Sequence, residues 1–138
     1  MLQSRDEIRQ TYLRVWDKIQ TGALLEPMEA TIADVIKMHP EYHPMLSTGE
    51  AIKEKDFTPE GGQTNPFLHM GMHIAIREQA GTDRPAGIQA IYRNLLKKQD
   101  AHDAEHAMIE CLGLILWQAQ RDNRAPDELA FLNALKKL

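Results

Sequence analysis

The chain of 138 residues is long enough to bury a hydrophobic core, and its 43% hydrophobic and 26% charged composition is that of a globular protein. The formal net charge of −4, with no Lys/Arg run, argues against nucleic acid as a partner, because phosphate binding needs a concentrated basic patch. The single cysteine, Cys111, rules out a disulfide framework and a thiolate zinc cluster, and it favours a cytoplasmic location. The most apolar run, residues 108–117, is too short to span a membrane.

Two helices are predicted at the start of the chain. Ser4 and Glu7 match a capping box, and apolar residues at helical spacing then predict a helix over residues 5–21 that stops at Gly22. The second helix begins near Pro27 and ends near residue 38, because Pro40 disfavours helical geometry at the preceding residue. Pro40 can open a short third helix, which Pro44 shortens or kinks.

A long loop and a buried helix are predicted next. Residues 47–64 lack a sustained period and contain a TPEGG turn signal, so they are expected to form a loop that walls a site. Asn65 and Pro66 suit the start of a helix, and Gly81 suits its end. This helix is apolar on most sides, which is typical of a buried central helix.

Three further helices complete the prediction. The first runs from Pro85 to about Gln99, the second is long and capped by Asp100, and the last covers residues 126–138. No segment alternates as a strand does. The predicted fold class is therefore all-α, a single-domain helical bundle of about six helices with a long connecting loop.

All six histidines fall into pairs whose members are four residues apart. On a helix this spacing places both imidazoles on one face, where they can bind one metal ion. Pro40 and Pro44 interrupt regular helical geometry around the first pair, so its pairing is the least regular. The candidate metal ligands are His39, His43, His69, His73, His102 and His106.

Helical projection of residues 101–120 turns His102 and His106 toward the protein interior, with Glu105 beside them and Glu110 at the edge of the same face. Packing of this helix against the helix of His69 and His73 is expected to gather four imidazoles, as in metal-binding bundles. Either glutamate would then serve as a further ligand or as a general base. Imidazole and carboxylate ligands suit zinc, iron, manganese or nickel.

If the protein is an enzyme, the expected chemistry is activation of a metal-bound water for hydrolysis or transfer. Candidates for holding the rings in place are Glu41, Asp56 and Glu60. The string HDAEH also matches the H-x-x-E-H pattern of inverted zinc proteases, but neither a third ligand nor a substrate cleft accompanies it.

The alternative interpretation is an interaction or regulatory module whose histidines form a buried hydrogen-bonded network, loosened by protonation near neutral pH. An exposed apolar face could support a homodimer. Neither interpretation names a small-molecule ligand.

Four motifs together resemble a family of small, uncharacterised, mostly proteobacterial proteins described as a domain of unknown function. They are MHPEYH at 38–43, NPFLHMGMHIAIREQ at 65–79, TDRPAGI at 82–88 and AEHAMIECLG at 104–113. The resemblance extends over nearly the whole chain. It implies a bacterial, cytoplasmic, stand-alone domain, and it implies no activity.

Overall fold

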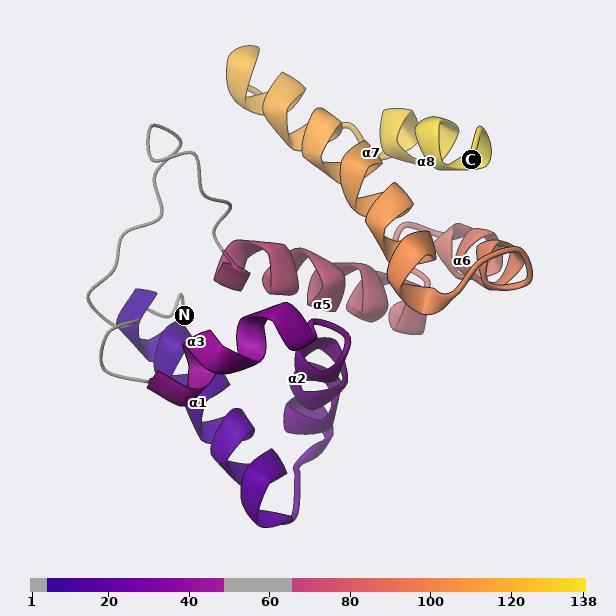
Figure 1. Ribbon diagram of the computed structural model, residues 1–138. Coiled ribbons are helices and arrows are strands. Elements are labelled where there is room, and N and C mark those ends of the chain that lie inside the picture. The colour runs from indigo at the N-terminus through magenta and orange to yellow at the C-terminus, as the bar shows by residue number, and fades with distance from the viewer. Residues whose placement is uncertain (1–4, 49–65) are drawn as a thin grey trace. The chain divides into compact units, whose positions relative to one another are not determined.

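The computed structural model describes residues 5–48 and 66–138, with side chains from residue 7 onward. These residues form α-helices and one short 3-10 helix, and they contain no strand, so the all-α prediction is confirmed. None of the described helices is long and apolar enough to cross a membrane. Figure 1 labels the helices, whose bounds are α1 Arg5–Thr21, α2 Pro27–Lys37, η1 Pro40–Tyr42, α3 His43–Thr48, α5 Pro66–Thr82, α6 Ile88–Leu96, α7 Ala101–Arg121 and α8 Glu128–Lys136.

The chain divides into two compact units, Met1–Ile74 and Ala75–Leu138, and helix α5 carries the chain from one to the other. The prediction of one domain over residues 1–138 stays a prediction. Each unit is described by itself below.

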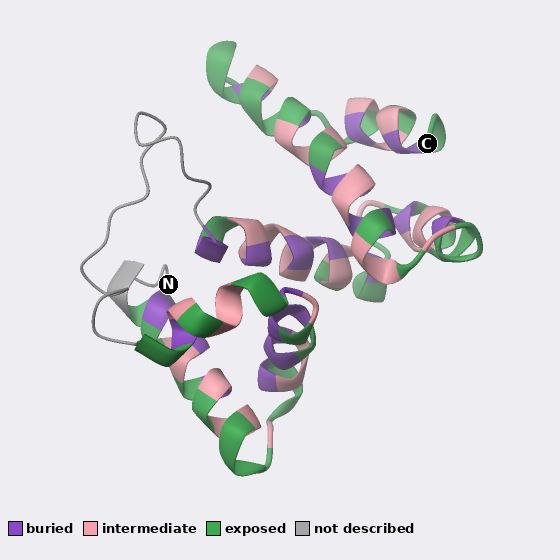
Figure 2. Ribbon diagram, viewed as in Figure 1, coloured by how far each residue is buried: buried purple, intermediate pink, exposed green. Residues whose placement is uncertain are grey.

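In the first unit α1 and α2 form a helical hairpin (Figure 1). The predicted start and end of α1 are confirmed, and Gly22 follows with a φ of +72°, a left-handed conformation that favours glycine. Lys18 on α1 binds the Glu29 carboxylate on α2 at 2.8 Å. The buried residues of α2 form one stripe along the helix (Figure 2). The core of this unit consists of Tyr12, Val15, Ile32, Ala33, Val35, Ile36, Leu46, Phe67 and Met70.

Pro40 opens a helical segment, as predicted, but the segment is the 3-10 turn η1, and α3 begins directly after it at His43. Pro44 lies in the first turn of α3, where its missing N–H costs no helical hydrogen bond. The two prolines therefore separate two short helical pieces.

In the second unit α6, α7 and α8 pack pairwise against one another. Asp100 caps α7 by accepting the N–H of Asp103, which confirms the predicted start of that helix. Asp127 caps α8 in the same way, so α8 begins two residues later than the prediction from Pro126.

The predicted start of α6 at Pro85 is wrong, because the Asp83 carboxylate accepts the N–H groups of Gly87 and Gln89 at 3.0 Å and folds the preceding residues into a loop. Gly87 has a φ of +104°, which a helix interior does not allow, so α6 begins only at Ile88. The end of α5 also lies slightly beyond the prediction, at Thr82 instead of Gly81.

Candidate metal centre

The first turns of α5 bring His69 and His73 together. The four-residue spacing places the two rings on one helix face, with ring centroids 4.8 Å apart. Their Nε2 atoms face each other at 3.2 Å. His73 is fully buried, whereas His69 is partly exposed. Two imidazole nitrogens, one from each ring, therefore lie at one position on this helix face.

His39 enters the same position from the end of α2. Its backbone is non-helical, with φ −123° and ψ 67°, because Pro40 follows it. Its Nδ1–H donates to the Val35 carbonyl at 2.8 Å, and the ring is 1% exposed. A carbonyl can only accept, so Nδ1 carries a proton, and in the neutral ring Nε2 is the nitrogen without one.

The three rings meet edge to face. The His39 centroid lies 5.0 Å from that of His69 and 4.8 Å from that of His73. A ring nitrogen from each lies within 4.8 Å of the others. Within this unit the three histidines thus form a compact group of ring nitrogens, an atom type that can ligate a metal, drawn from the end of α2 and from α5.

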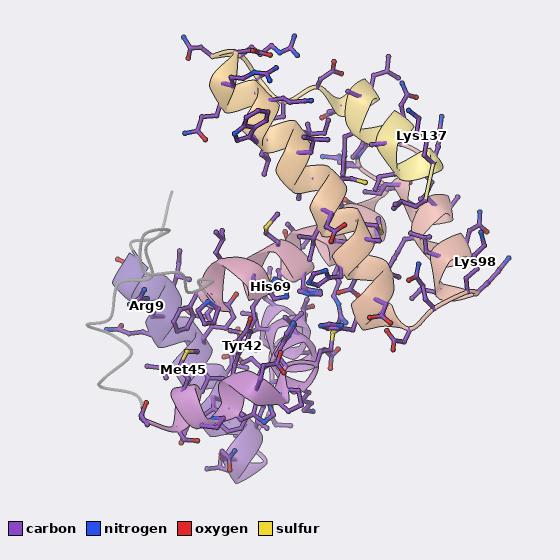
Figure 3. All side chains as sticks on the ribbon, turned by 45° about the horizontal axis from the view of Figure 1, so that its top comes forward. Arg9, Tyr42, Met45, His69, Lys98 and Lys137 are labelled. Atoms are coloured by element: carbon purple, nitrogen blue, oxygen red, sulfur yellow. The ribbon has the colours of Figure 1, made fainter. Side chains whose placement is uncertain are left out.

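Tyr42 lines the group. Its ring stacks on His39, with centroids 5.3 Å apart and planes at 10°. The centroid of the Tyr42 ring also lies 6.4 Å from that of His69, and Figure 3 labels both residues. Burial and the nearby Glu41 carboxylate raise the pKa of its phenol. Tyr42 therefore remains a neutral hydroxyl at physiological pH, and its ring fixes the plane of the His39 imidazole.

His43 is held by other contacts. Its Nε2–H donates to the Ile36 carbonyl at 2.9 Å, and its ring packs on Trp16 with centroids 4.6 Å apart. The 3-10 turn between His39 and His43 has about three residues per turn, so a four-residue spacing does not align the two rings.

In the second unit, α7 carries His102 and His106 on one face, with ring centroids 5.7 Å apart. The sequence indicated that both point inward, but their side chains are 38% and 45% exposed. The buried stripe of α7 passes through Ala104 and Met108, and the histidines lie at its edge. Glu110 is largely exposed, and its carboxylate lies 3.9 Å from His106 Nδ1.

Glu105 is fully buried, as its inward projection indicated. The Arg77 Nε–H donates to both of its carboxylate oxygens, at 3.1 and 3.0 Å, and the Tyr92 hydroxyl donates to Oε2. Burial and this hydrogen bond raise the pKa of Tyr92, which keeps the phenol a donor. The charge of Glu105 is thus compensated by a cation and a hydroxyl within its own unit.

Three residues of these arrangements were not singled out from the sequence: Tyr42, Arg77 and Tyr92. Tyr42 lies between His39 and His43 in the string HPEYH, and its proximity to them was the available signal. The apolar spacing of its helix predicts that Tyr92 is buried, but nothing in the sequence pairs Tyr92 or Arg77 with Glu105, because that pairing arises from tertiary packing. Asp56, Glu60 and most of the predicted loop lie outside the described residues, whereas Glu41 is exposed.

A family model described as "Domain of unknown function (DUF1841)" matches residues 4–137 of the chain. No curated protein and no solved structure matches the chain.

Proposed function

The chain belongs to the DUF1841 family, a domain of unknown function, and we propose that it binds a divalent transition metal, zinc in the first place, through His39, His69 and His73. The observation that carries the proposal is the convergence of three imidazoles on one position in the first unit. The family name assigns no activity, so the argument rests on geometry and donor chemistry.

The separation of the ligating atoms fits a tetrahedral ion. A zinc–nitrogen bond of ~2.0–2.1 Å with tetrahedral angles places two nitrogen ligands about 3.3 Å apart. The Nε2 atoms of His69 and His73 are 3.2 Å apart. The third nitrogen lies no more than 4.8 Å from them, so a side-chain shift of at most ~1.5 Å completes the set.

The hydrogen bond from His39 to Val35 supports the same proposal. Metal-ligating histidines commonly donate their other ring N–H to a carbonyl or carboxylate, which fixes the tautomer and the orientation of the ring. His39 does so at 2.8 Å, and Tyr42 stacks on the same ring. This ring is therefore oriented before any ion arrives.

The donor set also favours some metals over others. Among the described residues of this unit, the group contains imidazoles and no carboxylate. Imidazole suits zinc, iron and nickel, whereas manganese prefers oxygen ligands. Three protein ligands on zinc leave a fourth position for water, whose pKa the ion lowers, and this is the chemistry of a metal-dependent hydrolase or transferase.

Metal content tests the proposal directly. Protein without an affinity tag, purified without chelator and without a nickel column, is analysed by elemental mass spectrometry and then titrated calorimetrically with zinc, iron(II) and nickel. We expect about one equivalent of one ion. His39→Asn, His69→Asn and His73→Asn should each weaken metal binding by at least tenfold, since a ligand is lost.

His43→Ala is the matched control, because it removes a histidine from the same segment that is held by Ile36 and Trp16. It should lower thermal stability while metal content stays unchanged. His102→Ala and His106→Ala test the prediction from the sequence that these two histidines are also ligands. Glu110→Gln tests the prediction that the Glu110 carboxylate is a further ligand or a general base. Protein that is isolated without metal and takes up none of the three ions would refute the proposal.

The second candidate is a non-enzymatic interaction or regulatory module with a structural histidine network. The hydrogen bond between the Nε2 atoms of His69 and His73 favours it, since these rings already contact each other. Under this reading, His73→Asn lowers the melting temperature, and neither wild type nor variant carries metal. The same set of samples therefore separates the two candidates.

A further inference from the structure

The second unit contains a cavity of about 520 Å³. It lies between α7, α8 and the segment from Gln79 on α5 to Pro85. Apolar side chains dominate its wall, and Ile115 and Phe131 are buried while Leu116 is 43% exposed at its edge. The wall includes Leu112, Ile115, Leu116, Pro126 and Phe131. The volume lies within the range of small-molecule sites, which are mostly apolar with a few polar groups that orient the ligand.

One such polar group is present. Gln79 lines the cavity, and its Oε1 is buried and accepts no hydrogen bond from any residue in 5–48 or 66–138. A buried amide oxygen without a donor is costly, and structures rarely leave one unsatisfied. The backbone oxygen of the same residue does accept, from the Arg84 N–H at 3.0 Å. The side-chain oxygen is therefore an acceptor in need of a donor.

Charges around the cavity argue for a neutral occupant. Arg84, which is exposed, contributes a positive charge to the cavity wall, and Asp127 and Glu128 contribute negative charges. Asp127 is already used as the cap of α8. Charges of both signs give no net preference for an anion or a cation.

We propose that this cavity binds a small neutral organic molecule with an apolar body and one N–H or O–H group, and that the Gln79 amide turns its buried Oε1 toward the cavity to accept from that group. The apolar body would fill the space between Leu112, Ile115 and Phe131. The lining residues of this cavity all belong to the second unit, and none of them is a histidine of the proposed metal site.

Indole and benzofuran are suitable probes, because the two bicyclic molecules have nearly the same shape and only indole has an N–H donor. Fragments of this size reach a Kd of roughly 0.1–1 mM when they fit well. Binding is followed by ¹⁵N heteronuclear NMR titration of the full chain. We expect saturable shifts at residues of the cavity wall and about tenfold tighter binding of indole than of benzofuran.

Gln79→Leu removes the acceptor and should abolish the preference for indole, so that both probes bind with similar Kd. Gln120→Leu, the same substitution at an exposed position of α7 outside the cavity wall, should keep the preference. Leu116→Trp, which fills the cavity from its edge, should weaken both probes. Absence of saturable binding by either probe, or a preference for indole that survives in Gln79→Leu, would overturn the proposal.

Discussion

Arg77→Met should destabilise the second unit strongly, because it leaves the Glu105 carboxylate buried without its cation. Glu105 is 0% exposed, and Arg77 Nε reaches both of its oxygens within 3.1 Å. Removing one partner of a buried pair costs roughly 3–5 kcal/mol. The Arg77 side chain is 21% exposed and Tyr92 still donates to the carboxylate, so the lower end, about 3 kcal/mol, is expected.

A double-mutant cycle with Glu105→Gln separates the charge from packing. Thermal and urea unfolding are followed by circular dichroism for the wild type, both single variants and the double variant. For a chain of this size, about 3 kcal/mol lowers the melting temperature by roughly 10 °C. Glu105→Gln should destabilise the wild type, yet it should stabilise the Arg77→Met variant, because it removes the uncompensated buried charge.

The sign of the effect of Glu105→Gln in the Arg77→Met background decides whether the two side chains are coupled. If Glu105→Gln destabilised both backgrounds by the same amount within ~0.5 kcal/mol, the two residues would not be coupled and the reasoning would be refuted. The same samples test the prediction from the sequence that Glu105 is a metal ligand or general base. Since its carboxylate is held by Arg77 and Tyr92, we expect Glu105→Gln to keep its metal content.

Two further predictions concern ionisation and backbone geometry. All three tyrosines have a raised pKa, owing first to burial, and the pKa of Tyr12 rises to about 12. The stability that these neutral phenols contribute is therefore fully present below pH ~10, and it is lost as the pH rises through the folded-state pKa values. Absorbance at 295 nm should accordingly show little tyrosinate until the protein unfolds in base, and a full signal with a midpoint near the ordinary value would contradict it. Gly87→Ala should cost about 1 kcal/mol, because Gly87 has a φ of +104° although no atom lies within 4 Å of an added Cβ. Gly81→Ala, in open space on helix α5 with no positive φ, is the matched control and should stabilise by roughly 0.5 kcal/mol in urea unfolding, so equal effects of the two changes would refute the backbone explanation.

The helices whose ends depend on local chemistry were predictable from the sequence. α1 ends before Gly22 and α7 begins after Asp100, since a left-handed glycine and a capping carboxylate act within a few residues. The start of α6 was not predictable in this way. The start of α6 depends on the Asp83 side chain, which accepts the N–H of Gln89 six residues later. Pro85, two residues after Asp83, instead predicted a helix that begins earlier.

The histidine group was predictable in part. His69 and His73 were expected to share a helix face, and they do. The four-residue spacing pairs His39 with His43, whereas the structure brings His39 to His69 and His73 instead. The reason is the backbone at Pro40, which ends α2 and inserts a 3-10 turn, so that spacing along the chain no longer reports which rings meet.

Helix α5 limits how the protein can be divided. The boundary between the units falls at Ile74, inside α5, with His69 and His73 before it and Arg77 after it. A fragment that stops at this boundary would retain nine residues of the helix, and isolated helices shorter than ~12 residues are marginal in water. Dissection by expression of separate halves should therefore extend the first fragment to Thr82 and begin the second at Pro66, so that each keeps the complete helix.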